Sequence, residues 1–338
     1  MYHMEKEIQE QPGAILRTLE NSAECIDKIA SEIKPETVYL VGSGSSYNCG
    51  RIFSYIYEQL TGKKAISCYA MEFASSVKET VGEKDAVFIL SQSGESLDAV
   101  RAAKGIENIV AVTNTENSTL SKAAKWRILS RAGKENAVPS TKSFTSMLSA
   151  LTLYAARAGK SKKIERSLFE IPKTLEAALS ESGKTAIQTG RRISGSNCLD
   201  IIGDGINYPV TLESALKMKE TALIHAQGMP VAEYFHGHIS MVSEGYPVML
   251  MAAGKEKEET TKRIIERLSG LKAYSPVFSF EGSGLSGLGG ASAIELPKVE
   301  KLLSPFLSVP IIQLIALNAA IAKGINPDVP RALSKVVR

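Results

Sequence analysis

The sequence predicts an α/β protein with two domains, each built on a parallel β-sheet that is flanked by helices. Short apolar runs alternate with stretches of helical composition, which is the pattern of strands joined by helical crossovers. The length of 338 residues is enough for two domains of ordinary size. The opening strand–loop–helix pattern also occurs twice, which indicates that one domain has been duplicated.

Composition and charge exclude several classes of protein. With 44% hydrophobic and 22% charged residues, the chain can bury two cores. Its net charge of +4 is spread along the sequence without an arginine-rich run, so we expect no nucleic-acid partner. The N-terminal residues do not resemble a signal peptide, and the most apolar segment, Val309–Ala322, is short and carries Gln313 and Asn318. We therefore expect a cytoplasmic protein without a membrane partner.

The first domain begins with a helical segment. Apolar residues recur at helical spacing between Ile8 and Ile33, and Pro35 ends the segment. The apolar runs that follow are predicted to be buried strands, at Val38–Val41, Ala65–Tyr69, Ala86–Leu90, Ile109–Val112 and Arg127–Leu129.

The second domain repeats the start of the first. The matching positions, all at a constant offset of 161 residues, are Gly42 and Gly203, Gly44 and Gly205, and Tyr47 and Tyr208. The predicted strands of the second set are Leu199–Ile202, Val248–Met251, Pro276–Phe280 and Ala293–Leu296. A polar helical stretch separates the two sets, so we place the domains at residues 1–180 and 181–338.

Three loops in the first domain are rich in hydroxyl groups and follow predicted strands. They are Gly44-Ser45-Ser46, the run from Ser91 through Gln92, Ser93 and Gly94 to Ser96, and Ser140-Thr141-Lys142-Ser143. In open parallel sheets, ligands bind beyond the carboxyl ends of the strands. Free backbone N–H groups, hydroxyls and a helix dipole can together hold a phosphate. A single such loop is more often an ordinary helix cap, but three at one edge favour an anion site.

A dinucleotide site is excluded at the first loop. The fingerprint G-x-G-x-x-G would place glycine where the chain has Tyr47. The acidic residue that follows about 20 positions later in that motif is also missing, so we expect no nucleotide cofactor.

A charged helix in the second domain is a candidate for proton transfer. Glu213, Lys217 and Glu220 are spaced by four and three residues, which places them on one helical face. Such a stripe is usually a solvated set of ion pairs. This helix follows the repeated Gly-x-Gly loop at the ligand edge of the sheet, which favours a functional role.

Histidine and cysteine residues do not form an evident metal site. Glu233, His236 and His238 are close in sequence, but a further spaced ligand is missing, so acid–base catalysis by one histidine is favoured over zinc. His225 is expected to pack or to cap a helix. The four cysteines are widely spaced and are expected to be reduced and mostly buried thiols.

Six segments together resemble the isomerase half of glucosamine-6-phosphate synthase, a family with two sugar-isomerase (SIS) domains. In chain order they are GSGSSYN, LSQSGES, PSTKSFTS, YPVTLESALKMKE, IHAQGMPVAEYFHG and VPRALSK, and they span nearly the whole chain. The resemblance implies two flavodoxin-like SIS domains, each a parallel five-stranded sheet between helices, in a homodimer that binds a small phosphosugar.

The resemblance also assigns roles to individual residues. Glu220 is the implied base, Lys217 stabilises the enolate-like intermediate, His236 of the partner subunit opens the sugar ring, and Lys335 forms a Schiff base with the ketone. No metal or cofactor is implied. The positions implied to bind the substrate and its phosphate are Ser45, Ser46, Ser91, Gln92, Ser93, Ser96, Val138, Ser140 and Ser334.

This sequence departs from the family in ways that bear on the reaction. About 37 residues precede the first strand, so the family's glutaminase domain is expected to be absent. His238 stands where proline is usual, and the chain ends soon after Lys335. Without channelled ammonia, the resemblance implies a deaminase that converts glucosamine 6-phosphate to fructose 6-phosphate and ammonia, or the reverse. The alternatives are a deglycase acting on fructosamine 6-phosphates and a non-catalytic sugar-phosphate-binding regulator.

Overall fold

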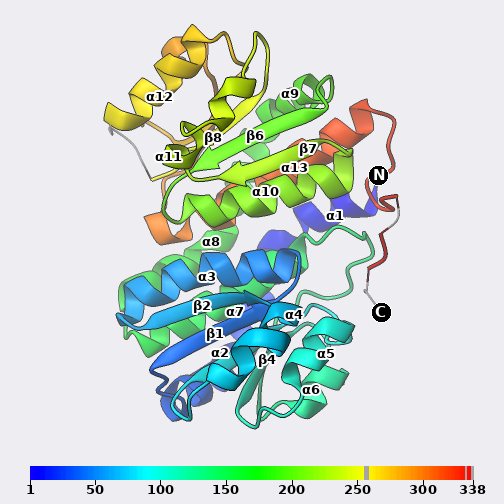
Figure 1. Cartoon of the computed structure of the whole chain (residues 1–338), viewed down its shortest axis with the longest axis vertical. Coiled ribbons are helices and arrows are strands. Elements are labelled where there is room, and N and C mark those ends of the chain that lie inside the picture. The colour runs from blue at the N-terminus through cyan, green and yellow to red at the C-terminus, as the bar shows by residue number, and fades with distance from the viewer. Residues whose placement is uncertain (255–258, 332, 336–338) are drawn as a thin grey trace. The chain divides into compact units, whose positions relative to one another are not determined.

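The computed structural model describes residues 1–254, 259–331 and 333–335, and within it the chain divides into two compact units (Figure 1). The N-terminal unit comprises Glu10–Pro172 and Ser334–Arg338, and the C-terminal unit comprises Met1–Gln9 and Lys173–Leu333. The division falls inside the helix Lys162–Glu181. The boundary predicted at residue 180 lies in the same helix. In addition, the first nine residues group with the C-terminal unit, and residues 334 and 335 group with the N-terminal unit.

The N-terminal unit contains a five-stranded parallel sheet with strand order β2-β1-β3-β4-β5. Strands β3 and β4 are buried along their whole length, as expected for central strands covered on both faces. The strands are β1 (Thr37–Gly42), β2 (Lys64–Tyr69), β3 (Ala86–Leu90), β4 (Ile109–Thr113) and β5 (Trp126–Leu129). All five predicted strands of this domain are therefore confirmed.

Helices cover both faces of this sheet (Figure 1). On one face, α2, α3 and α7 pack against one another, while α4, α5 and α6 cover the apolar side chains of the other face. The helices are α2 (Gln11–Glu32), α3 (Ser45–Thr61), α4 (Ala70–Glu72), α5 (Leu97–Ala103), α6 (Thr119–Ala123), α7 (Lys142–Ala158) and α8 (Lys162–Glu181), with a π-helical turn at Phe73–Val77 and a 3-10 turn at Lys78–Thr80.

The C-terminal unit repeats this topology. Its sheet has the order β10-β9-β8-β6-β7, and all its pairings are parallel. Taken from β7 to β10, this order matches that of the first sheet from β2 to β5. The strands are β6 (Cys198–Gly203), β7 (His225–Met229), β8 (Val248–Met251), β9 (Pro276–Phe280) and β10 (Ser292–Leu296). Two flavodoxin-like α/β units with five-stranded sheets are thus confirmed.

Helices also cover both faces of the second sheet. Helices α9, α10 and α13 pack together on one face, whereas α12 contributes to the apolar cluster of the other (Figure 1). The helices are α1 (His3–Gln9), α9 (Gly183–Ile193), α10 (Asn207–Ala222), α11 (Val231–Tyr234), α12 (Glu259–Gly270) and α13 (Pro305–Ala322), with 3-10 turns at His238–Met241, Leu288–Gly290 and Lys301–Leu303.

The most apolar helix is part of this core. Among the described residues, one segment, Lys301–Ala322, is long and apolar enough to cross a membrane, but 83% of its most apolar window is buried inside the protein. It contains α13, which contacts α9, α10 and α1. The apolar composition of this segment is explained by its place in the core.

Strand β7 was missed by the sequence analysis. Its sequence, HAQGM, lacks a run of apolar residues because β7 lies at the sheet edge and exposes alternate side chains. His225 is one of these exposed side chains, so the expectation that it packs was wrong.

Candidate functional site

The hydroxyl-rich loops of the N-terminal unit meet at a small pocket. Its lining residues come from the start of α3, the loop after β3 and the start of α7, and they are Ser45, Ser46, Gln92, Ser140, Ser143, Phe144 and Met147. The pocket lies where parallel strands end and α3 and α7 begin, so the positive ends of these helix dipoles lie beside it. This arrangement suits an oxyanion such as a phosphate.

A glycine-dependent turn shapes the start of α3. Gly44 precedes the helix with φ +55°, and Gly205 occupies the matching place before α10 with φ +59°. Both angles lie in the left-handed region, which disfavours side chains. The repeated Gly-x-Gly motif therefore encodes the same turn in both units.

The Ser91–Ser96 turn is held together by its own hydroxyls. The Ser91 hydroxyl accepts a hydrogen bond from Gly94 N–H at 3.1 Å and lies 3.0 Å from the Ser96 hydroxyl. The Ser93 hydroxyl accepts from Glu95 N–H at 3.1 Å. Of the predicted binding residues in this turn, only Gln92 lines the pocket. The three serines shape the loop that presents it.

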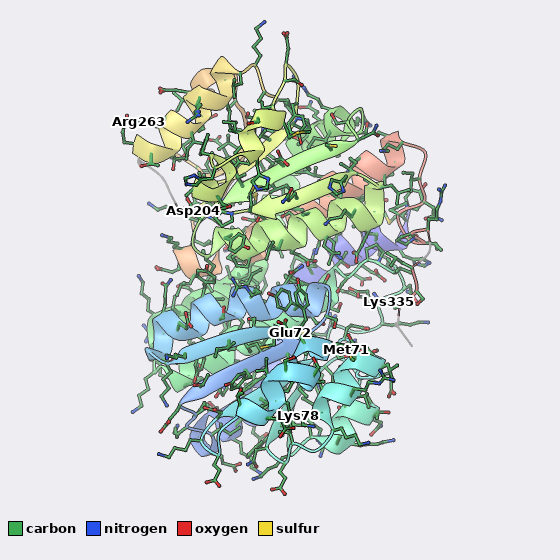
Figure 2. The ribbon with its side chains drawn as sticks, viewed as in Figure 1. Met71, Glu72, Lys78, Asp204, Arg263 and Lys335 are labelled. Atoms are coloured by element: carbon green, nitrogen blue, oxygen red, sulfur yellow. The ribbon has the colours of Figure 1, made fainter. Side chains whose placement is uncertain are left out.

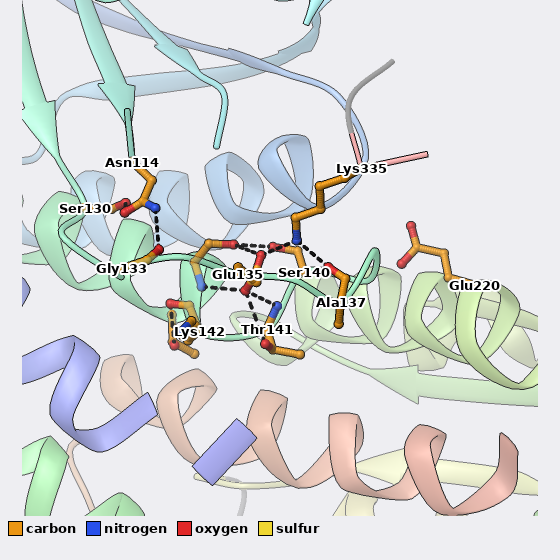
Figure 3. Close-up of polar contacts among 12 residues, drawn as sticks. Asn114, Ser130, Gly133, Glu135, Ala137, Ser140, Thr141, Lys142, Glu220 and Lys335 are labelled. Carbon is orange, nitrogen blue, oxygen red and sulfur yellow. Dashed lines mark hydrogen bonds and ion pairs between the residues drawn. The ribbon is translucent and has the colours of Figure 1, made fainter. Parts of the chain in front are cut away.

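The tail lysine lies in the same unit. The Lys335 ammonium donates to the Glu135 carboxylate at 2.5 Å and to the Ala137 carbonyl at 2.7 Å (Figure 3). Val138 follows Ala137 and is half-buried, while Ser334 is exposed. The loop 135–140 therefore joins the lysine contact to the pocket residue Ser140.

Glu135 is charged although it is completely buried. Burial by itself would raise the pKa of its carboxyl group, but the Lys335 charge and hydrogen bonds from Lys335 and Ser143 hold that pKa below its ordinary value. Glu135 was not among the residues predicted from the sequence, because its partner is 200 residues away in the chain. No local spacing signal could have identified the pair.

The charged stripe of α10 is buried rather than solvated. Lys217 is 0% exposed, and its ammonium lies 2.5 Å from the Glu220 carboxylate and 3.5 Å from that of Glu213. Glu213 is 1% exposed and Glu220 is 21% exposed. The shared face predicted from the spacing is confirmed. Because this face is buried, the three residues are not a solvated set of surface ion pairs.

Lys217 and Glu220 do not lie at the loop edge of their own sheet. Helix α10 begins at Asn207, after β6, and Glu220 is in its last turn. The helical rise from Asn207 to Glu220 is about 20 Å. The helix starts after the repeated Gly-x-Gly loop, as predicted, but Lys217 and Glu220 lie near its other end because a crossover helix runs back toward the start of the next strand.

His236 and His238 lie between α11 and β8 of the C-terminal unit. His236 follows α11 and is exposed, and His238 begins a 3-10 turn. Among the residues that the structure describes, no three His, Cys, Asp or Glu side chains gather where they could hold a metal ion. The cysteines are free thiols, of which Cys49 and Cys68 are buried.

The turn of the C-terminal unit that corresponds to Ser91 and Gln92 has no polar side chain at these two positions. Ala252 and Ala253 stand where the offset of 161 residues matches Ser91 and Gln92. Asp204, which is labelled in Figure 2, lies in the loop after β6 and accepts a hydrogen bond from the Val231 N–H. The amide of Asn207 donates to the Ala253 carbonyl at 3.0 Å. These side chains bind their own loops, so the duplicated units have diverged at this edge.

The repeated five-stranded fold, with hydroxyl-bearing residues at the strand ends of the N-terminal unit, is typical of proteins with tandem SIS domains. A family profile described as "SIS domain" matches residues 33–157 and 192–323. The chain therefore belongs to the SIS-domain family and carries the domain twice.

Within this family, the chain is related to the isomerase C-terminal half of glutamine–fructose-6-phosphate aminotransferase. It is 32% identical to the enzyme of that name from Yersinia pseudotuberculosis, over 99% of this chain and 58% of the relative, and equally identical to that of Aquifex aeolicus, over 99% and 57%. The chain thus spans a little over half the length of these curated relatives.

Solved structures show the same fold. The C-terminal domain of glucosamine-fructose-6-phosphate aminotransferase from Francisella tularensis superposes with a TM-score of 0.89 at 24% identity, over 98% of each chain. A candidate phosphosugar isomerase from Silicibacter pomeroyi gives 0.81 at 30% identity, over 97% of this chain and all of the other. A glucosamine-6-phosphate deaminase from Thermotoga maritima gives 0.79 at 24% identity, over 99% of each chain.

Proposed function

We propose that the chain is an enzyme that converts glucosamine 6-phosphate to fructose 6-phosphate and ammonia, or catalyses the reverse reaction. The observation that carries the proposal is the pocket of Ser45, Ser46, Gln92 and Ser140 at the strand ends, with the Lys335 ammonium held on the adjoining loop. Its hydroxyls and helix N-termini suit a sugar phosphate, and the lysine supplies an amine for carbonyl chemistry. The names of the relatives support a phosphosugar as the substrate class.

The proposed reaction moves one proton and exchanges one amine. Glu220 takes the proton from C2 of the open-chain amino sugar and returns it to C1, while Lys217 stabilises the negative charge that develops on the C1 oxygen. Carbon 2 is then an imine. The neutral Lys335 amine adds to C2, ammonia leaves, and water hydrolyses the new imine to the ketone and the free lysine. The sum is amino sugar phosphate plus water giving ketose phosphate plus ammonia.

One assay tests this function. Purified protein is incubated with glucosamine 6-phosphate, and ammonia and fructose 6-phosphate are measured together. We expect equal amounts of both products, no turnover of unphosphorylated glucosamine, and a borohydride-trapped sugar-phosphate adduct on Lys335. Lys134→Gln is the matched control for Lys335→Gln, because Lys134 is an exposed lysine on the loop that Lys335 contacts. Turnover of a fructosamine 6-phosphate without deamination of glucosamine 6-phosphate would instead support the deglycase.

A mixing experiment tests the proposed homodimer. If His236 of the partner subunit opens the sugar ring, then Glu220→Gln and His236→Ala proteins are each inactive alone. Mixed dimers would contain one intact site each, so an equal mixture after subunit exchange should recover about a quarter of wild-type activity. A mixture that forms mixed dimers and stays inactive would place His236 in the site of its own subunit, whereas an active His236→Ala protein would remove His236 from the site.

A further inference from the structure

Glu135 joins the tail of the chain to the start of α7. One carboxylate oxygen accepts the backbone N–H groups of Thr141 and Ser143, both at 3.0 Å. The other accepts the Ser143 hydroxyl at 2.7 Å and the Lys335 ammonium at 2.5 Å. One buried carboxylate therefore caps a helix and binds the tail lysine (Figure 3).

The loop that carries Glu135 is fixed from behind by Asn114. Its amide donates to the Gly133 carbonyl at 2.7 Å, and its oxygen accepts from the Ala132 N–H at 2.8 Å (Figure 3). Asn114 follows β4, which is buried along its whole length. The carboxylate is therefore attached to the rigid sheet and not to a free loop.

A chain of hydroxyls connects Glu135 to the pocket. The Ser143 hydroxyl lies 2.7 Å from that of Ser140 and donates its hydrogen to Glu135. A hydroxyl has one hydrogen, so Ser143 accepts from Ser140. Ser140 then presents only lone pairs to a ligand, which suits the hydroxyl group of a sugar. The charge of Glu135 thus sets the polarity of this end of the pocket.

The nearby cation of α7 is engaged elsewhere. Lys142 has a 6% exposed side chain, and its ammonium lies 2.5 Å from the Glu10 carboxylate. Lys335 is the cation that contacts Glu135, and that contact opposes the cost of burying the carboxylate. The two pairs are separate, so each lysine has its own carboxylate.

We propose that Glu135 is the positioning residue for Lys335, holding its ammonium beside the Ser140 end of the pocket until the substrate engages the amine. The proposal rests on the function proposed above and states how the reactive lysine of that site is held before the substrate binds. An amine bound in this pair is protonated and occupied, so it cannot add to a carbonyl until it leaves the carboxylate. Glu135 then acts through Lys335 and does not touch the reacting atoms.

The first test measures the chemical reactivity of Lys335 without any substrate. Protein is treated briefly with an acetylating reagent at fixed pH, and acetylation of Lys335 and Lys134 is quantified in the same digest. In Glu135→Gln the side-chain oxygen can still cap α7, but the charge that holds the lysine is gone. We expect Lys335 acetylation to rise on the order of tenfold while Lys134 is unchanged. Equal Lys335 acetylation in wild type and Glu135→Gln would overturn the proposal, because this result is expected if Glu135 only caps α7.

The second test keeps Glu135 and removes its partner, so it does not depend on the folding of the first variant. In Lys335→Met the pKa of the Glu135 carboxyl should rise, since the lysine charge holds it down. Carbon-13 NMR of labelled glutamate follows this titration, and Lys134→Met is the control. An unchanged Glu135 titration would refute the pairing.

Turnover measurements separate the proposed deaminase function from the proposed pairing of Glu135 with Lys335. If wild-type protein deaminates glucosamine 6-phosphate, Glu135→Gln should lower kcat more than it raises KM, because the phosphate contacts remain. Fully retained kcat would overturn the positioning role. If wild-type protein has no deaminase activity but the reactivity and titration results are as expected, the proposed function fails and the Glu135–Lys335 pairing stands.

Discussion

Replacing Lys217 with methionine tests whether the buried charges of α10 are structural, catalytic or both. The ammonium is 0% exposed and lies between Glu213, 1% exposed, and Glu220, 21% exposed. Removing one partner of a buried ion pair costs roughly 3–5 kcal/mol of unfolding free energy. Glu220 can reach water, so most of this cost arises at Glu213. A loss of this size is a large fraction of the roughly 5–15 kcal/mol by which domains are stable.

The assay is equilibrium unfolding in urea, followed by circular dichroism, with Lys219→Met as the control. Lys219 is an exposed lysine on the same helix, and its substitution should change the unfolding free energy by less than about 0.5 kcal/mol. Adding Glu213→Gln to Lys217→Met should restore about 2 kcal/mol or more, because the unpaired buried charge is removed. Lys217→Met protein as stable as wild type would refute the reasoning about buried charge.

The double variant also separates stability from catalysis. If it is folded but inactive toward glucosamine 6-phosphate, Lys217 contributes to the reaction itself. If it retains wild-type turnover, Lys217 serves only to compensate the buried carboxylates. Both results are informative because the comparison is made between proteins of similar stability.

Three further predictions concern the N-terminal unit. Gly94→Ala should lower the unfolding free energy by about 2–5 kcal/mol, because φ is +66° and the new Cβ would lie 2.1 Å from the Ser118 hydroxyl oxygen. Adding Ser118→Gly should remove the overlap but not the strain of the positive φ, so urea unfolding should show only part of the loss restored. Lys335 and Ser143 hold the pKa of the buried Glu135 carboxyl below its ordinary value, so its stabilising effect is complete above that ordinary value and is lost as the pH falls through the folded pKa. The difference in unfolding free energy between wild type and Glu135→Gln should shrink in that acid range, and a constant difference down to about pH 3 would contradict this assignment. Trimming the chain after Leu333 should abolish deamination and lower stability by on the order of 1–3 kcal/mol, because Glu135 loses its counter-ion; normal turnover of the trimmed protein would remove Lys335 from the mechanism.

The sequence by itself determined the architecture of both units. The central strands are buried on both faces, so they appear as apolar runs that can be read without any tertiary information. The Gly-x-Gly loops require positive φ angles, so their repetition revealed the duplication. The hydroxyl-rich loops could be placed at one sheet edge because parallel strands all end there. Edge strand β7 was missed because a strand that is exposed on alternate residues carries no apolar run.

Only the tertiary structure decided how the charges are paired. Spacing placed Glu213, Lys217 and Glu220 on one face, but not that this face is buried or that Glu220 lies in the last turn of its helix. It also could not pair Glu135 with Lys335, which are 200 residues apart. Burial and long-range contacts depend on how the chain returns on itself, and they determine whether a charged residue is a solvated surface group or a buried partner with a shifted pKa.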